Sequence, residues 1–173
     1  MKRTILALCL LPISISTMAL TDLGAKGDLK FTLQIRQGAC ELVKDNIEVD
    51  LGRAVLKQPV RIGTELNPTT FSIGLKNCSD VIRVYVTMDG TPNADDPNLF
   101  ALDAGGAKGV GLKIKTAAGE QQFPKNTTPT PIEFTINSDG SHQLNYIASY
   151  VPIRADAMIG RADATVDFTV QYE

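Results

Sequence analysis

Residues 160–173 read GRADATVDFTVQYE, and this stretch decides the fold. Apolar or aromatic residues occupy every second position, and the positions between them are polar or charged. The apolar positions are Ala162, Ala164, Val166, Phe168, Val170 and Tyr172. Because successive side chains of a β-strand point to opposite faces, this period of two predicts a strand over residues 162–172 with one buried face.

A second alternating segment lies near the other end of the sequence, at residues 27–36. Its apolar face consists of Leu29, Phe31, Leu33 and Ile35. We expect no hairpin partner before this segment and none after residues 162–172, so both strands leave exposed edges that pair with other chains unless they are blocked. The two segments are also able to pair with each other within one domain, and the pattern leaves both arrangements open.

Between these segments lie further short apolar or β-branched runs, most of them separated by turn residues. The runs are residues 47–51, 71–75, 81–88, 110–114, 132–136 and 142–151. Pro59, between Gly52 and Gly63, disfavours a helix there, and we expect only a short helical turn at residues 98–102. About eight short strands with turns between them predict an all-β sandwich.

The composition describes one soluble domain and excludes several kinds of partner. The chain has 173 residues, of which 43% are hydrophobic and 21% charged. Its 17 Lys+Arg against 19 Asp+Glu give no electrostatic basis for binding nucleic acid or an anionic membrane surface. One histidine and three cysteines are too few for a multi-histidine or four-cysteine metal site.

Two clusters suggest chemistry at first sight, but their spacing does not support it. His142 follows Asp139 and Ser141, yet neighbours in a strand point to opposite faces, so a surface histidine is favoured over a catalytic triad. The aspartates in residues 88–97 lack the spacing and the terminal glutamate of an EF-hand loop, which favours a solvated turn. We therefore expect no enzyme activity, no metal and no cofactor.

Residues 1–19 have the three parts of a secretory signal peptide. Lys2 and Arg3 precede an apolar run from Ile5 to Ile15, and small residues lead to Ala19. The run is shorter than the roughly 20 residues that a membrane-spanning helix needs. We expect export with cleavage after Ala19, and no direct insertion of the mature chain into a membrane.

Cleavage would remove Cys9 and leave two cysteines, Cys40 and Cys78. In an exported protein such a pair predicts a disulfide, and the alternative of two free thiols is disfavoured by the oxidising compartment. The bond would contribute about 4 kcal/mol by restricting the unfolded chain.

Four motifs follow one another along the chain. They are Gly38-Ala39-Cys40, Val49-Asp50-Leu51-Gly52, residues 71–78 from Phe71 to Cys78, and residues 160–173. This ordered set, with its cysteine pair and penultimate Tyr172, resembles the type 1 fimbrial subunits of the chaperone-usher pathway. The resemblance covers essentially the whole mature chain.

The resemblance implies an incomplete immunoglobulin-like β-sandwich that lacks its seventh strand and is completed by donor-strand complementation. It divides the chain into a signal peptide (residues 1–19), an N-terminal donor-strand extension (20–37) and a pilin domain (38–173). The donor residues would be Leu29, Phe31, Leu33 and Ile35. The chaperone-binding residues would be Val166, Phe168, Val170, Tyr172 and Glu173.

The implied function is that of a structural subunit of a fimbria, which polymerises by donor-strand exchange and supports cell adhesion. A periplasmic pilus chaperone, an outer-membrane usher and neighbouring pilin subunits would be its partners, on a route through the periplasm to the cell surface. The family usually has glycine two residues after the position of Phe31, where this chain has Leu33, which favours a minor subunit. The alternatives are a base-proximal terminating subunit and a self-contained periplasmic module that binds a sugar or another small ligand.

Overall fold

The computed structural model describes residues 38–124, 131–158 and 160–173, which form eight strands and no helix within those ranges. The signal peptide and the predicted donor segment lie outside the described residues. The strands are β1 (Ala39–Leu42), β2 (Leu66–Ser79), β3 (Arg83–Asp89), β4 (Val110–Thr116), β5 (Gln121–Gln122), β6 (Ile132–Thr135), β7 (Gly140–Pro152) and β8 (Asp167–Tyr172).

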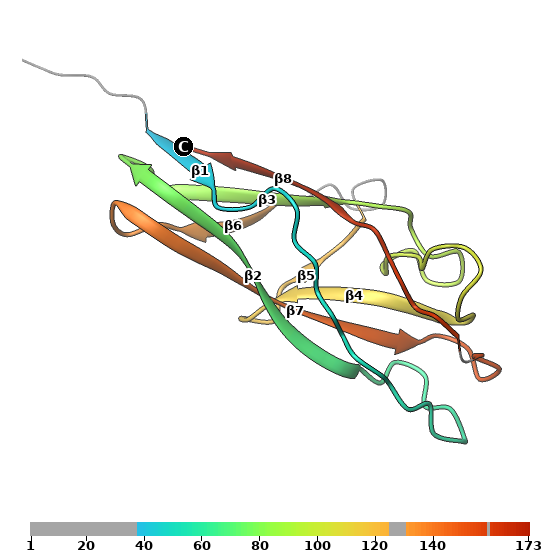
Figure 1. The fold of residues 1–173 in the computed structure, drawn as a ribbon. Helices are drawn as coiled ribbons and strands as arrows, with labels where there is room; N and C mark the ends of the chain where they lie inside the picture. Colours follow the sequence, from blue (N-terminus) through green and yellow to red (C-terminus); the bar gives the residue numbers. More distant parts are fainter. Residues whose placement is uncertain (1–37, 125–130, 159) are drawn as a thin grey trace, which may run out of the picture. The chain divides into compact units, whose positions relative to one another are not determined.

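The strands form two antiparallel sheets that face each other across one core (Figure 1). The larger sheet has the order β1-β2-β7-β4-β5, and the smaller one has the order β6-β3-β8. Every strand pair in both sheets is antiparallel. The predicted all-β sandwich is therefore confirmed.

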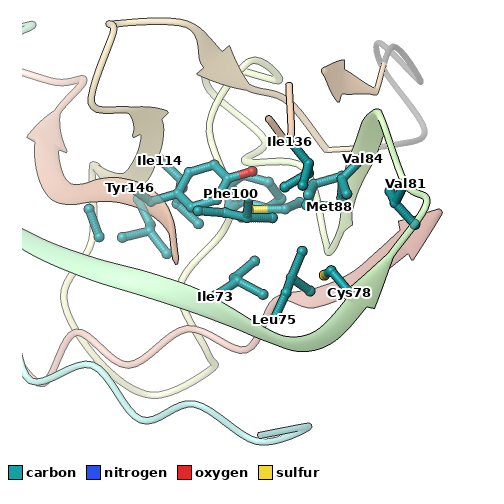
Figure 2. Packing of buried hydrophobic residues seen from close by; sticks show 14 residues of the cluster. Ile73, Leu75, Cys78, Val81, Val84, Met88, Phe100, Ile114, Ile136 and Tyr146 are labelled. Carbon is teal, nitrogen blue, oxygen red and sulfur yellow. The ribbon is translucent and has the colours of Figure 1, made fainter. Parts of the chain in front are cut away.

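The core follows from the period-two pattern of the long strands, whose apolar positions point inward. Figure 2 shows Tyr146, Phe100 and Met88 on one side of Ile73 and Leu75, all within one cluster of buried residues. Tyr146 stacks on Phe71 with a centroid distance of 5.5 Å. The ring of Tyr146 thus lies at the centre of the sandwich, and its side chain is 0% exposed.

The predicted disulfide between Cys40 and Cys78 is present and joins β1 to β2. It closes a loop with a sequence separation of 38. Cys78 is buried in the core cluster, and Cys40 packs against that cluster. The bond therefore fixes the start of the domain to its longest strand.

Two predicted strands are shorter than expected or absent. Residues 47–51 form no strand, and the strand predicted over residues 162–172 begins only at Asp167. Burial still alternates along both segments as the sequence predicts. The side chains therefore follow the strand pattern, while the backbone of these residues belongs to no ladder of either sheet.

The predicted helical turn at residues 98–102 is also wrong. The Leu99 amide donates to the Asp96 carbonyl at 3.0 Å, which closes a tight turn. Phe100 then exchanges two backbone hydrogen bonds of 2.9 Å with Leu112 of β4. This bridge holds the segment extended and places the Phe100 side chain in the core, where a helical turn would not put it.

The glycine-rich residues 105–111 lead into β4. Gly109 has φ of +67°, a backbone conformation that favours glycine, and β4 begins at the next residue. A Cβ at Gly109 would also lie 3.0 Å from the Cβ of Arg154. Gly109 therefore supplies the backbone conformation, and the space beside Arg154, that the chain needs just before β4 begins.

Candidate functional site

An open groove of about 540 Å³ lies between two extended segments, residues 47–51 and 163–168. We call residues 47–51 the first rim and residues 163–168 the second rim. In Figure 1 the segment after β1 and the segment that leads into β8 are both drawn without an arrow. The floor is largely apolar and comes from both sheets. Its residues are Phe71, Ile73, Met88, Leu112, Ile114, Ala148 and Tyr150.

The apolar side chains of both rims face the groove and are only half-buried. On the first rim these are Ile47, Val49 and Leu51, and the residues between them are exposed. On the second rim they are Ala164, Val166 and Phe168, again with exposed residues between them. All of these except Val49 pack against the core cluster, and all six stay half-exposed among the described residues.

The backbone along both rims has free edges within the described part of the chain. β8 pairs with β3 from Asp167 to Tyr172, and no described strand pairs with its other edge. The first rim belongs to neither sheet. The Asn67 side chain donates a hydrogen bond to the Leu51 carbonyl (3.0 Å), and the Gly52 amide donates one to the Asp50 carboxylate (2.7 Å).

A second cavity of about 460 Å³ extends the groove past the start of the second rim. Its apolar lining comes from Leu56, Leu66, Val110 and Met158, among others. Tyr150 lines both cavities and donates its hydroxyl proton to the Ala162 carbonyl. Burial raises the pKa of Tyr150, and the nearby carboxylates of Asp163 and Asp50 raise it further.

The residues predicted to bind a chaperone divide into two groups. Val166, Phe168 and Val170 pack inward against the core cluster beside the groove. Tyr172 is 42% exposed at the end of β8. Their role stays a prediction.

Glu173, the last of these predicted residues, is held against β3. One carboxylate oxygen accepts hydrogen bonds from the Tyr85 hydroxyl (2.9 Å) and from the Arg83 guanidinium (3.0 Å). These two donors hold the pKa of Glu173 below its usual value. The Glu173 backbone also bonds to Arg83 in both directions, which fixes the end of β8 to its neighbour.

The polar clusters considered in the sequence have structural roles. His142 Nε2 lies 2.7 Å from the Ser138 carbonyl oxygen. The Asp96 carboxylate accepts from the Asn98 amide (3.1 Å) within the turn, as expected for a turn aspartate. In residues 38–124, 131–158 and 160–173, no three His, Cys, Asp or Glu side chains are placed to hold a metal.

The same ranges contain no helix that is long and apolar enough to cross a membrane.

The family resemblance implies an open groove where a strand is missing, but the sequence pattern did not identify the residues that form its rims and floor. Residues 47–51 were expected to be an ordinary strand, and Tyr150 belonged to the run at residues 142–151. The alternation of residues 47–51 was the available signal for this rim, because these residues form one wall of the groove in the structure. The donor residues 29–35 lie outside the described residues and stay a prediction.

The family model for fimbrial proteins matches residues 29–173. The chain belongs to the fimbrial protein family. The fimbrial subunit is 52% identical to protein LpfE of Salmonella typhimurium over 165 residues, covering 95% of this chain and 94% of that protein. It is 44% identical to the probable fimbrial subunit LpfE of Escherichia coli O157:H7 over 155 residues, covering 90% of this chain and 88% of the relative.

A solved structure shows the same fold at low sequence identity. The P pilus rod subunit PapA superposes with a TM-score of 0.61 at 19% identity, covering 78% of this chain and 99% of PapA. This likeness concerns the fold. The family match and the LpfE relatives show that the chain is a structural subunit of a surface fimbrium, where it assembles with neighbouring subunits.

Proposed function

We propose that this fimbrial subunit polymerises by donor-strand exchange. Its groove accepts an extended segment from a neighbouring subunit, and its own residues 20–37 fill the groove of another. The observation that carries the proposal is the pair of rims, at residues 47–51 and 163–168, which are half-buried, apolar and without a strand partner on the groove side.

An added strand matches this site physically. Its backbone would pair with the free edge of β8, and its alternate side chains would cover the floor between the rims. Each Leu or Phe side chain moved from water into such a site contributes roughly 1.5–3 kcal/mol. Several such side chains, together with new ladder hydrogen bonds, favour stable joining of subunits.

The predicted donor residues have the chemistry that the groove requires. Leu29, Phe31, Leu33 and Ile35 are apolar and alternate with polar residues, so one face of an extended segment would be entirely apolar. We propose that this face enters the groove of the next subunit. The polar residues between them would stay in water.

Before assembly the open groove needs a temporary cover. We propose that a periplasmic pilus chaperone supplies a strand beside β8, in contact with Val166, Phe168 and Val170 and near Tyr172 and Glu173. An outer-membrane usher would then exchange the chaperone for the next subunit. This route implies transit through the periplasm after removal of residues 1–19, and a fibre that supports cell adhesion.

The groove favours this role over a small-ligand module and over catalysis. A small-ligand site usually has a few convergent polar groups, whereas here the polar rim residues are exposed between inward-facing apolar ones. A base-proximal terminating subunit would also need this groove for its chaperone, so that alternative is tested by whether the groove accepts a further subunit's segment. We propose a structural and not an enzymatic role for the chain.

The test introduces a charge on each face of the donor segment in turn. Phe31→Asp is expected to block incorporation into fibres, because burying an unpaired carboxylate is costly. The chaperone complex is expected to form normally, since the chaperone covers the groove and not this segment. Thr32→Asp is the matched control, because its side chain points to the opposite face of the segment.

Fibre incorporation and chaperone co-purification are measured for the wild type and both variants. The proposal predicts loss of incorporation for Phe31→Asp alone. Normal incorporation of Phe31→Asp would refute donor-strand exchange through this face. Equal loss for both variants would show that the segment is needed for another reason.

A further inference from the structure

We infer that Tyr150 determines which donor segments the groove accepts, and that the groove rejects this subunit's own N-terminal segment. The inference rests on the proposed donor-strand exchange. It concerns the specificity of that exchange, which the apolar character of the groove does not settle.

Tyr150 stands between the two cavities of the groove. It lines the cavity of about 540 Å³ and the cavity of about 460 Å³. Tyr150 belongs to β7, which forms part of the groove floor. Its hydroxyl donates to the carbonyl of Ala162, in the segment that leads into β8. Leu51 of the first rim also lines both cavities. A bulky ring, fixed at its far end, therefore divides the path that an added strand would follow.

The hydroxyl of Tyr150 also occupies a backbone acceptor beside that path. The carbonyls of Arg161 and Asp163 accept from the amides of Ala107 and Asp103, each at 2.7 Å. Carbonyls of successive residues in an extended chain point to opposite sides, so the intervening Ala162 carbonyl points away from those partners. An added strand at this position loses one acceptor, or it must displace the Tyr150 hydroxyl.

These two features define the donor that fits. Inward-facing residues of a strand follow one another at about 7 Å. Three successive inward-facing residues of a donor would therefore lie before the Tyr150 ring, over it and beyond it. A donor that fills both cavities must be bulky, then small where it crosses Tyr150, then bulky again. A large side chain over the ring would overpack the site.

The subunit's own segment lacks this pattern. Its inward face has no small residue among the four donor residues, which are Leu29, Phe31, Leu33 and Ile35. The small residues on this face are Ala25 and Gly27, which precede all four.

A shifted register does not rescue the fit. All strand pairs in the two sheets are antiparallel, and an antiparallel donor passes the larger cavity before it reaches Tyr150. With Gly27 over the ring, the larger cavity would receive only Ala25 and Leu23. The groove is thus suited to a different subunit's segment, with a glycine or alanine between two large apolar residues, and copies of this chain do not follow one another in the fibre.

The test compares three peptides of residues 20–37 for binding to the mature full chain. They carry the natural sequence, Leu33→Gly, or Thr32→Gly, and the last one controls for the added flexibility of a glycine. The Leu33→Gly peptide is expected to bind about tenfold more tightly than the natural peptide, by relief of overpacking. The Thr32→Gly peptide is expected to show no such gain, because residue 32 faces away from the groove.

The same peptides are then measured against Tyr150→Ala and Tyr150→Phe. Tyr150→Ala is expected to remove the preference for Leu33→Gly, because the natural Leu33 then has space. Tyr150→Phe keeps most of the ring and releases the Ala162 carbonyl, so it is expected to retain part of the preference. If the alanine variant does not fold, the phenylalanine variant decides, because its preference must be smaller than that of the wild type.

The outcomes separate the inference from the proposed function. Equal binding of the natural and Leu33→Gly peptides to the wild type overturns the inference and leaves donor-strand exchange intact. A preference that is unchanged in the Tyr150 variants overturns the role of Tyr150. Failure of every peptide to bind overturns donor-strand exchange and the inference together.

Discussion

Replacing both Cys40 and Cys78 by alanine is expected to lower the free energy of unfolding by about 4 kcal/mol. The disulfide closes a loop with a sequence separation of 38, and the chain-entropy model assigns about 4 kcal/mol to a loop of this length. A domain of this size is typically stable by about 5–15 kcal/mol. If the wild type lies at the lower end of this range, the variant would keep only about 1 kcal/mol of its free energy of unfolding.

The position of the disulfide gives this loss a functional consequence. β1 has only four residues (Ala39–Leu42), and its pairing with β2 has an irregularity between Ala39 and Glu41. Just after β1, the Val43 amide donates a hydrogen bond to the Gly74 carbonyl of β2 (2.8 Å). The first rim follows a few residues later, so loosening β1 is expected to weaken donor binding as well as stability.

The assay is urea denaturation followed by circular dichroism and tyrosine fluorescence, for the oxidised wild type and the double alanine variant. With a slope of about 2 kcal/mol per molar urea, the midpoint is expected to fall by about 2 M. Reduced wild-type protein is the control for lost side-chain volume, because it keeps both sulfur atoms. A midpoint that falls by less than about 0.5 M would refute the chain-entropy argument.

Two further predictions concern polar groups away from the groove. Gln122 is 2% exposed and donates to the Val86 carbonyl (3.1 Å) and the Tyr146 hydroxyl (3.3 Å), so Gln122→Leu is expected to cost about 1–3 kcal/mol in the same urea assay. The hydrogen bond from Lys115 holds the pKa of Glu65 below its usual 4.5. This stabilises the folded state at neutral pH and is lost as pH falls through the lowered pKa, so Glu65→Gln should lose less stability between neutral pH and about pH 3.

The sequence predicted the sandwich because its strands are long and one-sided. In β7 the buried positions Leu144, Tyr146 and Ala148 alternate with less buried residues, which is the pattern visible in the sequence. Very short strands have no such signal. β1 (Ala39–Leu42) and β5 (Gln121–Gln122) contain too few residues to show a period, and only their neighbours in the fold make them strands.

The candidate site was predictable only in part. The alternation of residues 47–51 and 162–168 was visible, but their position opposite each other depends on the folding of the residues between them. The division by Tyr150 depends on a side chain of β7 reaching the backbone at Ala162, twelve positions along the chain, through a bend that no local pattern indicates. Long-range contacts of this kind are beyond a reading of local periodicity.

The two errors in strand prediction share one physical cause, and that cause agrees with the proposed function. Residues 47–51 and 162–166 carry the side-chain pattern of strands, yet their backbones have no ladder partner on the groove side. Elsewhere the pattern and the pairing agree, as expected of a sequence that specifies its own fold. Local conflict of this kind concentrates at functional sites. Here the pattern suits a strand that the described part of the chain does not supply, and an incoming segment would provide the missing partner to both rims at once.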